Sequence, residues 1–118
     1  MSGLSIHVLD TSAGKPAAGM LVEFFRLHAD GALQCLAREH TDANGRTARP
    51  LIEPADLQPG RYQLTFHVGA YFATTGHRLP EPAFYDLIPI RFGIADTTTH
   101  YHVPLLVSPW SYTTYRGS

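Results

Sequence analysis

Residues 100–107 read HYHVPLLV, and their alternation of side chains is typical of a long β-strand with one face in a core. The inward face of such a strand carries four apolar side chains: Tyr101, Val103, Leu105 and Val107. The opposite face carries His100, His102, Pro104 and Leu106. This second face is too apolar in sum for open solvent, so we expect another subunit to cover it.

The same period of two residues recurs along the chain. It is clear in three further segments, residues 4–9, 61–68 and 87–94, and weaker in residues 20–28 and 33–41. Turn-forming residues separate the segments, as in Asp42-Ala43-Asn44-Gly45. The pattern predicts an all-β protein of seven or eight strands, most simply a two-sheet sandwich.

One stretch interrupts the alternation. We expect residues 70–73 to form a single short helix that Gly76 ends, and residues 79–83, with two prolines, to form an extended loop. Neither an internal repeat nor a linker is evident, so residues 1–118 are expected to form one domain.

The composition excludes some classes of partner. The formal net charge is −1, with 9 Lys plus Arg against 10 Asp plus Glu, which disfavours nucleic acids and anionic membranes as partners. Charged residues make up only 16% of the chain, against roughly 25% on average. This low content of charged residues again indicates that part of the surface is buried against another subunit in an oligomer. The single cysteine, Cys35, cannot form an internal disulfide.

Targeting signals are not evident in the sequence. The opening residues 1–6 lack a basic segment followed by an apolar one, and no apolar run approaches the roughly 20 residues of a membrane helix. We therefore expect a soluble cytoplasmic protein.

The seven histidines are the most informative residues. His7 and His102 lie off the apolar faces of an early and a late strand. Terminal strands of a sandwich can be neighbours in one sheet, which would bring both imidazoles onto one outer face where they could act on one substrate. We interpret the four histidines in other segments as solvated residues: His28, His40, His67 and His77.

Two further features bear on chemistry. His100 and His102 have a spacing that is also common among metal ligands on a strand, although no third ligand is evident nearby in the sequence. Arg46 follows the turn at residues 42–45, and its guanidinium suits carboxylates or carbonyl-bearing heterocycles. Residues 108–118 include Trp110 and two tyrosines, so we expect this tail to be ordered against something.

These residues together resemble a known family. Residues 6–11 read IHVLDT, residues 41–46 read TDANGR, residues 100–109 read HYHVPLLVSP and residues 115–118 read YRGS. In this combination, and over essentially all of the 118 residues, the sequence is similar to the 5-hydroxyisourate hydrolases, the transthyretin-related enzymes of urate degradation. The tetrapeptide YRGS is the hallmark that separates these enzymes from the hormone-carrying transthyretins.

The resemblance implies a fold, an assembly and an activity. The fold is a transthyretin-like (prealbumin-like) sandwich with a short helix, assembled as a homotetramer that is a dimer of dimers, with active sites where the dimers meet. The activity is hydrolysis of 5-hydroxyisourate to 2-oxo-4-hydroxy-4-carboxy-5-ureidoimidazoline, without a cofactor or a metal. The resemblance assigns catalysis to His7, Arg46 and His102. It assigns substrate binding to Tyr115, Arg116, Gly117 and Ser118.

Three other hypotheses remain open at the level of sequence. The protein could be a transthyretin-like carrier of a small hydrophobic ligand, although a carrier has no reason to place two imidazoles and a guanidinium in its channel. It could be a metal-dependent hydrolase that uses His7, His100 and His102, which chelation would test. A structural module of a larger assembly is disfavoured because no linker is evident.

Overall fold

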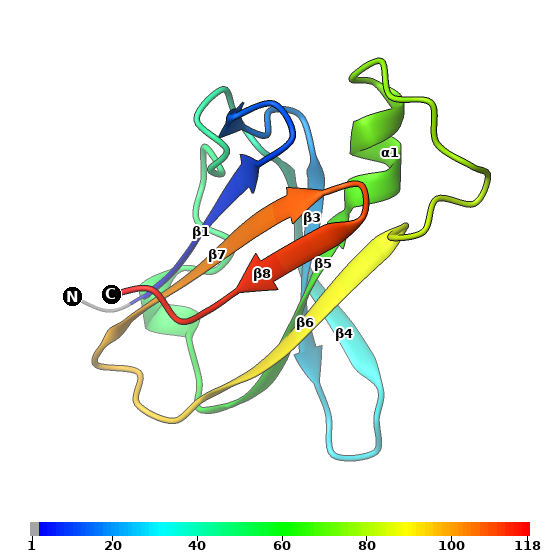
Figure 1. Cartoon of the computed structure of the whole chain (residues 1–118). Helices are drawn as coiled ribbons and strands as arrows, with labels where there is room; N and C mark the ends of the chain where they lie inside the picture. Colours follow the sequence, from blue (N-terminus) through cyan, green and yellow to red (C-terminus); the bar gives the residue numbers. More distant parts are fainter. Residues whose placement is uncertain (1–2) are drawn as a thin grey trace.

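The computed structural model describes residues 3–118, and over that range the chain forms two packed four-stranded sheets. The first sheet has the order β2-β1-β7-β8 (Figure 1). Its strands are β1 (Gly3–Asp10), β2 (Lys15–Pro16), β7 (His100–Ser108) and β8 (Ser111–Thr114). The second sheet has the order β4-β3-β5-β6. Its strands are β3 (Leu21–Leu27), β4 (Leu33–His40), β5 (Gly60–His67) and β6 (Leu87–Ile94). The predicted two-sheet sandwich is confirmed.

The sequence shows neither a targeting signal in residues 1–6 nor an apolar run long enough for a membrane helix. Residues 1 and 2 of the first segment lie outside the described residues. Within residues 3–118, no helix combines the length and apolar character needed to cross a membrane.

The pairing of β1 with β7 decides where the functional side chains lie. These two strands run parallel, with Ile6 opposite Val103 and Ser5 opposite His102. Both strands turn alternate side chains inward, where Ile6, Val8 and Leu105 are fully buried. Since side chains alternate between the faces of a sheet, the odd-numbered residues of β1 and the even-numbered residues of β7 share the outer face.

The core fills the space between the sheets. The second sheet contributes large inward side chains, and Phe24 stacks on Tyr62 with ring centroids 5.2 Å apart. Burying such side chains contributes about 1.5–3 kcal/mol each. The alternation read from residues 61–68 and 87–94 correctly identified this inward face, including Leu64, Phe66 and Ile88.

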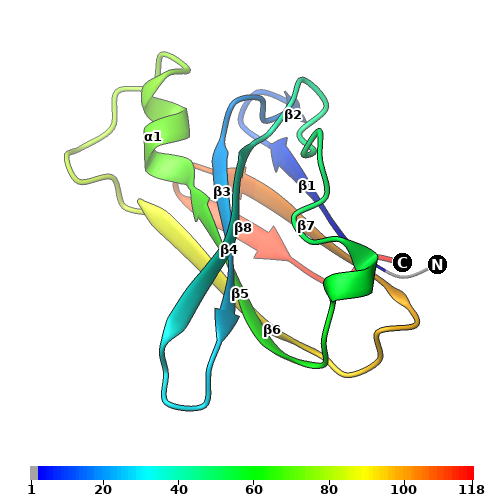
Figure 2. The same ribbon diagram turned by 180° about the vertical axis from the view of Figure 1, so that it is seen from behind.

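The helix closes one end of the sandwich (Figures 1 and 2). It is α1 (Val68–Ala73), slightly longer than predicted, and a single 3₁₀ turn (Pro54–Asp56) lies at the other end. Val68 was expected in a strand but begins the helix and remains fully buried. The Tyr71 hydroxyl donates to the buried Asp10 carboxylate at 2.8 Å, which ties α1 to the end of β1.

The hydrogen bond between Tyr71 and Asp10 contributes to a shift in the pKa of each residue. Burial opposes ionisation of Asp10, but hydrogen bonds from Ser12, Tyr71 and two backbone amides outweigh it and hold the pKa of Asp10 below its usual range. Burial and the same carboxylate raise the pKa of Tyr71 to about 12. Asp10 is therefore a structural residue that joins the turn after β1 to α1.

Candidate active site

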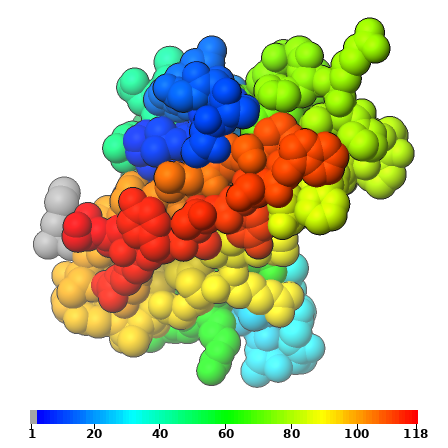
Figure 3. Space-filling view, viewed as in Figure 1, coloured from blue at the N-terminus to red at the C-terminus, as the bar shows by residue number. Residues whose placement is uncertain are grey.

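The outer face of the first sheet brings two of the predicted residues together. His7 on β1 is opposite Pro104 on β7, one alternation away from the pair formed by Ser5 and His102. His7 and His102 are half-buried on this face. Figure 3 views the face directly, with the C-terminal residues lying across it below β1. The prediction that terminal strands would place both imidazoles on one face is confirmed.

Arg46 reaches the same face because its loop is anchored to β1. Gly45 accepts a hydrogen bond from the Val8 amide at 2.8 Å and has a φ of 73°, in the left-handed region that favours glycine. A Cβ at Gly45 would lie 2.3 Å from the Val8 carbonyl oxygen. Asp42 closes the turn by accepting from the amides of Asn44 and Arg46. Position 45 therefore requires glycine for Arg46 to sit beside His7.

The contact between Arg46 and His7 determines which ring nitrogen of His7 carries the proton. A guanidinium nitrogen of Arg46 lies 3.5 Å from Nδ1 of His7, a long hydrogen bond. Because a guanidinium has no lone pair to offer, it is the donor and Nδ1 is the acceptor. A neutral His7 then carries its proton on Nε2, so that this nitrogen can act as a hydrogen-bond donor.

His102 has a different environment. Its Nδ1 lies 2.7 Å from the Ser5 hydroxyl. Burial, and then the charges of Arg46, His7 and His100, lower the pKa of His102 below its ordinary value of 6.5, although a hydrogen bond with the Ser5 backbone opposes the shift. His102 is thus neutral near pH 7, which is the form that accepts a proton.

The tail contacts His102 through Gly117. The Gly117 amide donates to the His102 carbonyl at 2.8 Å. A Cβ at Gly117 would lie 2.6 Å from Cδ2 of the His102 ring, so only glycine allows this approach. The expectation that the tail is ordered is confirmed: β8 carries it back along β7, and residue 117 reaches the imidazole.

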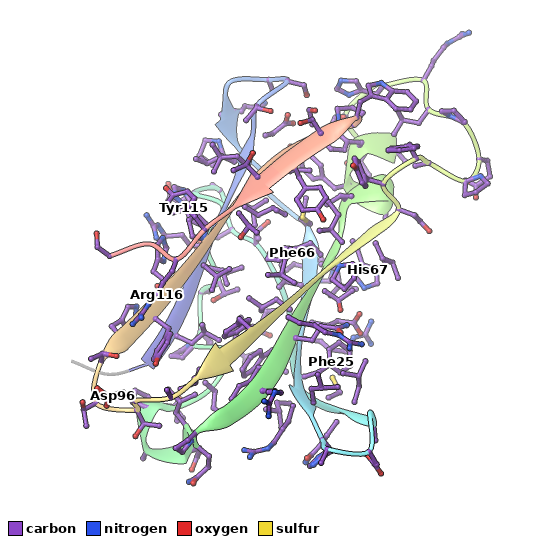
Figure 4. The ribbon with its side chains drawn as sticks, turned by 60° about the horizontal axis from the view of Figure 1, so that its bottom comes forward. Phe25, Phe66, His67, Asp96, Tyr115 and Arg116 are labelled. Carbon is purple, nitrogen blue, oxygen red and sulfur yellow. The ribbon has the colours of Figure 1, made fainter. Side chains whose placement is uncertain are left out.

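The other tail residues point elsewhere in the single chain. The Arg116 guanidinium lies over the Tyr101 ring, 4.3 Å from its centroid, on the side of Asp96 (Figure 4). Tyr115 and Ser118 are exposed. The structure therefore brings together His7, Arg46, His102 and Gly117, but it does not place Arg116 against the imidazoles.

Ser5 is a site residue that the sequence reasoning missed. Its hydroxyl also lies 2.8 Å from Nε2 of His100, so one oxygen bridges two imidazoles. The strand pattern placed Ser5 on the same face as His7, and this was the available signal. His100 lies beside the site through Ser5, and within residues 3–118 no three His, Cys, Asp or Glu side chains are grouped to hold a metal ion.

The hollows of the surface do not all coincide with this cluster. A hollow of about 360 Å³ borders Ser5, Arg46 and His100. A larger one, about 750 Å³, lies over β4 near the Arg49 and Glu39 ion pair. Of the predicted catalytic residues only Arg46 lines the smaller hollow, and His7 and His102 line neither, so the size of a hollow does not locate the cluster.

Of the four histidines interpreted as solvated residues, His28, His40 and His77 are exposed, whereas His67 is only partly exposed. His28 contacts Gln34 at 2.9 Å and His77 contacts Thr75 at 2.8 Å, both on the surface. His67 contacts the Glu23 carboxylate at 2.5 Å on the outer face of the second sheet (Figure 4). None of the three lies on the face that carries His7.

The sandwich and its imidazole-lined outer face define a protein of the transthyretin structural class. Sea bream transthyretin, solved in complex with thyroxine, matches with a TM-score of 0.86 and 30% identity, over 97% of this chain and 93% of that one. The chain belongs to the HIUase/Transthyretin family, whose model matches residues 4–117.

Enzymes of that family are similar over their full length. A relative from Rhizobium meliloti, 5-hydroxyisourate hydrolase 2, is 51% identical over 115 residues, covering 98% of this chain and 95% of the relative. The structure of Klebsiella pneumoniae 5-hydroxyisourate hydrolase matches with a TM-score of 0.80 and 38% identity, over 99% of this chain and 100% of that one. The resemblance found in the sequence motifs is thereby confirmed.

Proposed function

We propose that this protein is a 5-hydroxyisourate hydrolase, which opens the six-membered ring of its substrate at an amide bond in urate degradation. The product is 2-oxo-4-hydroxy-4-carboxy-5-ureidoimidazoline. Full-length relatives named for this activity support the assignment. The observation that carries it within the chain is the meeting of His7, Arg46 and His102 on one face.

The chemistry of amide hydrolysis fits these three side chains. The reaction needs an activated water, a stabilised oxyanion and a protonated leaving nitrogen. One neutral imidazole accepts the proton of the attacking water, and the other orients that water or protonates the nitrogen. Arg46 binds the ring and offsets the negative charge that grows on the carbonyl oxygen, a type of stabilisation commonly worth about 3 kcal/mol per donor.

The tail completes the proposed pocket. Gly117 packs against His102 and so positions the last residues, Tyr115 walls the pocket, and Ser118 hydrogen-bonds the substrate or an imidazole. Because the Arg116 guanidinium is held over Tyr101 in the single chain, we assign its contact with substrate to the assembled protein. Among the described residues, no His, Asp or Glu side chain is hydrogen-bonded to the Ser118 hydroxyl or the Cys35 thiol, which favours direct attack by water.

We further propose that the working form is a homotetramer, a dimer of dimers with the sites at the dimer–dimer interface. Three large aromatic side chains are exposed: Phe84 (66%) in the loop before β6, Trp110 (59%) in the turn between β7 and β8, and Tyr115 (57%) just after β8. Aromatic residues are enriched in the interiors of protein interfaces. Their exposure in the single chain supports an oligomer that covers them.

The main alternative is that the protein carries a small hydrophobic ligand, as the similarity to a thyroxine-bound transthyretin suggests. A cluster of two imidazoles and a guanidinium disfavours it, since these groups would be desolvated by an apolar ligand without compensation. The discriminating experiment generates 5-hydroxyisourate in place by oxidising urate and follows its optical decay. Acceleration over the spontaneous rate supports the enzyme, and an unchanged rate supports the carrier.

A further inference from the structure

The Ser5 hydroxyl is shared by two imidazoles on the outer face of the first sheet. It lies 2.7 Å from Nδ1 of His102 and 2.8 Å from Nε2 of His100. A hydroxyl has one proton to donate and accepts with its lone pairs. It can therefore donate to only one of these two nitrogens, and the direction of the bridge decides on which nitrogen His102 carries its own proton.

The charged groups that act on His102 favour one direction of this bridge. The charges that act on its ring come from Arg46, His7 and His100, and all are cationic or become so on protonation. Arg46 is a permanent cation, and its contact with Nδ1 of His7 leaves the His7 proton on Nε2. A lone pair on Nε2 of His102 suits such donors, whereas an N–H there would oppose them.

His100 is free to complete the bridge. Its side chain is exposed, so its Nδ1 can carry the proton while Nε2 accepts from Ser5. The chain of hydrogen bonds then runs from Nδ1–H of His102 to the Ser5 oxygen, and from the Ser5 proton to Nε2 of His100. The second nitrogen of His102, Nε2, is left as a bare acceptor.

Building on the proposed function, we propose that Ser5 is a positioning residue that holds His102 in its Nδ1–H tautomer, so that Nε2 of His102 is the general base. His7, which is neutral and carries its proton on Nε2, is then the group that orients the attacking water. The proton of the water moves to Nε2 of His102, which becomes an imidazolium stabilised through Nδ1–H by the Ser5 oxygen. The imidazolium then gives this proton to the leaving nitrogen as the amide bond breaks, which restores the neutral base.

The first test reads the tautomer directly and does not depend on activity. Long-range nitrogen–proton correlation spectra of the full-length protein above pH 7 distinguish the two ring nitrogens of His102. We expect a protonated Nδ1 and a bare Nε2 in the wild type, and a shift toward the Nε2–H form in Ser5→Ala. A wild-type His102 protonated on Nε2 would overturn the proposal.

The second test uses kinetics with matched variants. Ser5→Ala should lower kcat on the order of 10- to 100-fold, as for other residues that orient a functional imidazole, while KM changes little. Ser5→Thr, which keeps the hydroxyl on a strand, should restore most of the rate. Ser108→Ala is the control, because Ser108 is a half-buried serine of the same sheet whose hydroxyl contacts only the Ser111 carbonyl among the described residues.

These outcomes separate the two proposals. An active wild type with an equally active Ser5→Ala variant would refute the role of Ser5 and leave the hydrolase assignment standing. A wild type without activity would refute the hydrolase assignment, while the spectra would still decide whether Ser5 holds the tautomer. A loss of rate in Ser5→Ala that Ser5→Thr fails to restore would count against the hydroxyl as the cause.

Discussion

At the scale of single residues, His102 differs from the other histidines in the charges around it. Burial and the neighbouring Arg46, His7 and His100 lower its pKa, whereas His28 and His77 are surface residues with a single polar contact each. Perturbed titratable groups gather at functional sites. The residue that the environment keeps neutral is also the residue that the proposed reaction needs as a base.

The alanine variants test the assignment of the site. His7→Ala, Arg46→Ala and His102→Ala should each lower kcat/KM by about 10²–10⁴-fold, because each removes a group that acts on the transition state. Circular dichroism and size-exclusion chromatography should show an unchanged fold and assembly. Wild-type turnover in any two of these variants would refute the assignment.

The pH dependence of the activity follows from the direction in which the pKa of His102 is shifted. A lowered pKa means that His102 stays in its neutral, proton-accepting form down to a lower pH, so activity should fall only as the pH drops below 6.5. Arg46→Gln removes a cation that disfavours the imidazolium and should raise the pKa of His102, which an NMR titration of the ring protons measures. Arg49→Gln, which removes an exposed cation paired with Glu39, should leave that titration unchanged.

At the scale of elements, strand pairing explains which features the sequence could predict. Alternation in residues 4–9 and 100–107 revealed the strands and their inward faces, because each has one face in the core. Alternation does not reveal which strands are neighbours. The parallel register that sets Ser5 opposite His102 arises from packing over the whole sandwich, and the bridge through Ser5 could not be predicted without it.

The alternation of side chains also could not predict the shortest elements, β2 and β8. β2 has only two residues, so it offers no period to detect, and it forms because Leu9 and Asp10 pair with the chain returning from the turn. β8 has four residues, and three are exposed. The family motif predicted that Gly117 belongs to the site, but the reason, its contact with the His102 ring, is visible only in the fold.

Gly117 provides a test at this scale. Gly117→Ala should displace the tail or the His102 ring, because the added Cβ would lie 2.6 Å from a ring carbon, and the catalytic rate should fall about tenfold or more. Gly93→Ala is the matched control, since a Cβ there would be 4.0 Å from its neighbour, the Gly60 carbonyl oxygen. Equal activity of the two variants would show that the tail does not position His102.

At the scale of the whole molecule, the outer face of the first sheet and the aromatic residues beside it are what a second copy would cover. Phe84 packs edge-on against Tyr85, which packs against Tyr112, and Phe84 also lies 5.9 Å from Trp110, so these four aromatics form one cluster. Closed symmetric assemblies bury such patches against themselves. The low content of charged residues, 16%, agrees with this interpretation.

The assembly can be tested by one pair of variants. Light scattering should give a tetramer for the wild type and smaller species for Trp110→Glu, because a charge would be buried in the interface, and activity should fall with the loss of the tetramer. Leu33→Glu alters a similarly exposed apolar residue on the second sheet and should leave the tetramer intact. A monomeric and fully active wild type would contradict the proposed assembly.

In the proposed function, His7, Arg46 and His102 on this face hydrolyse 5-hydroxyisourate. The most direct measurement is the initial rate of decay of 5-hydroxyisourate, generated in place from urate, with the wild type and with His102→Ala, each before and after exhaustive chelation. We expect a saturable acceleration by the wild type that survives chelation and is lost in His102→Ala. Decay at the spontaneous rate with the wild type, or equal acceleration by the two proteins, would contradict it.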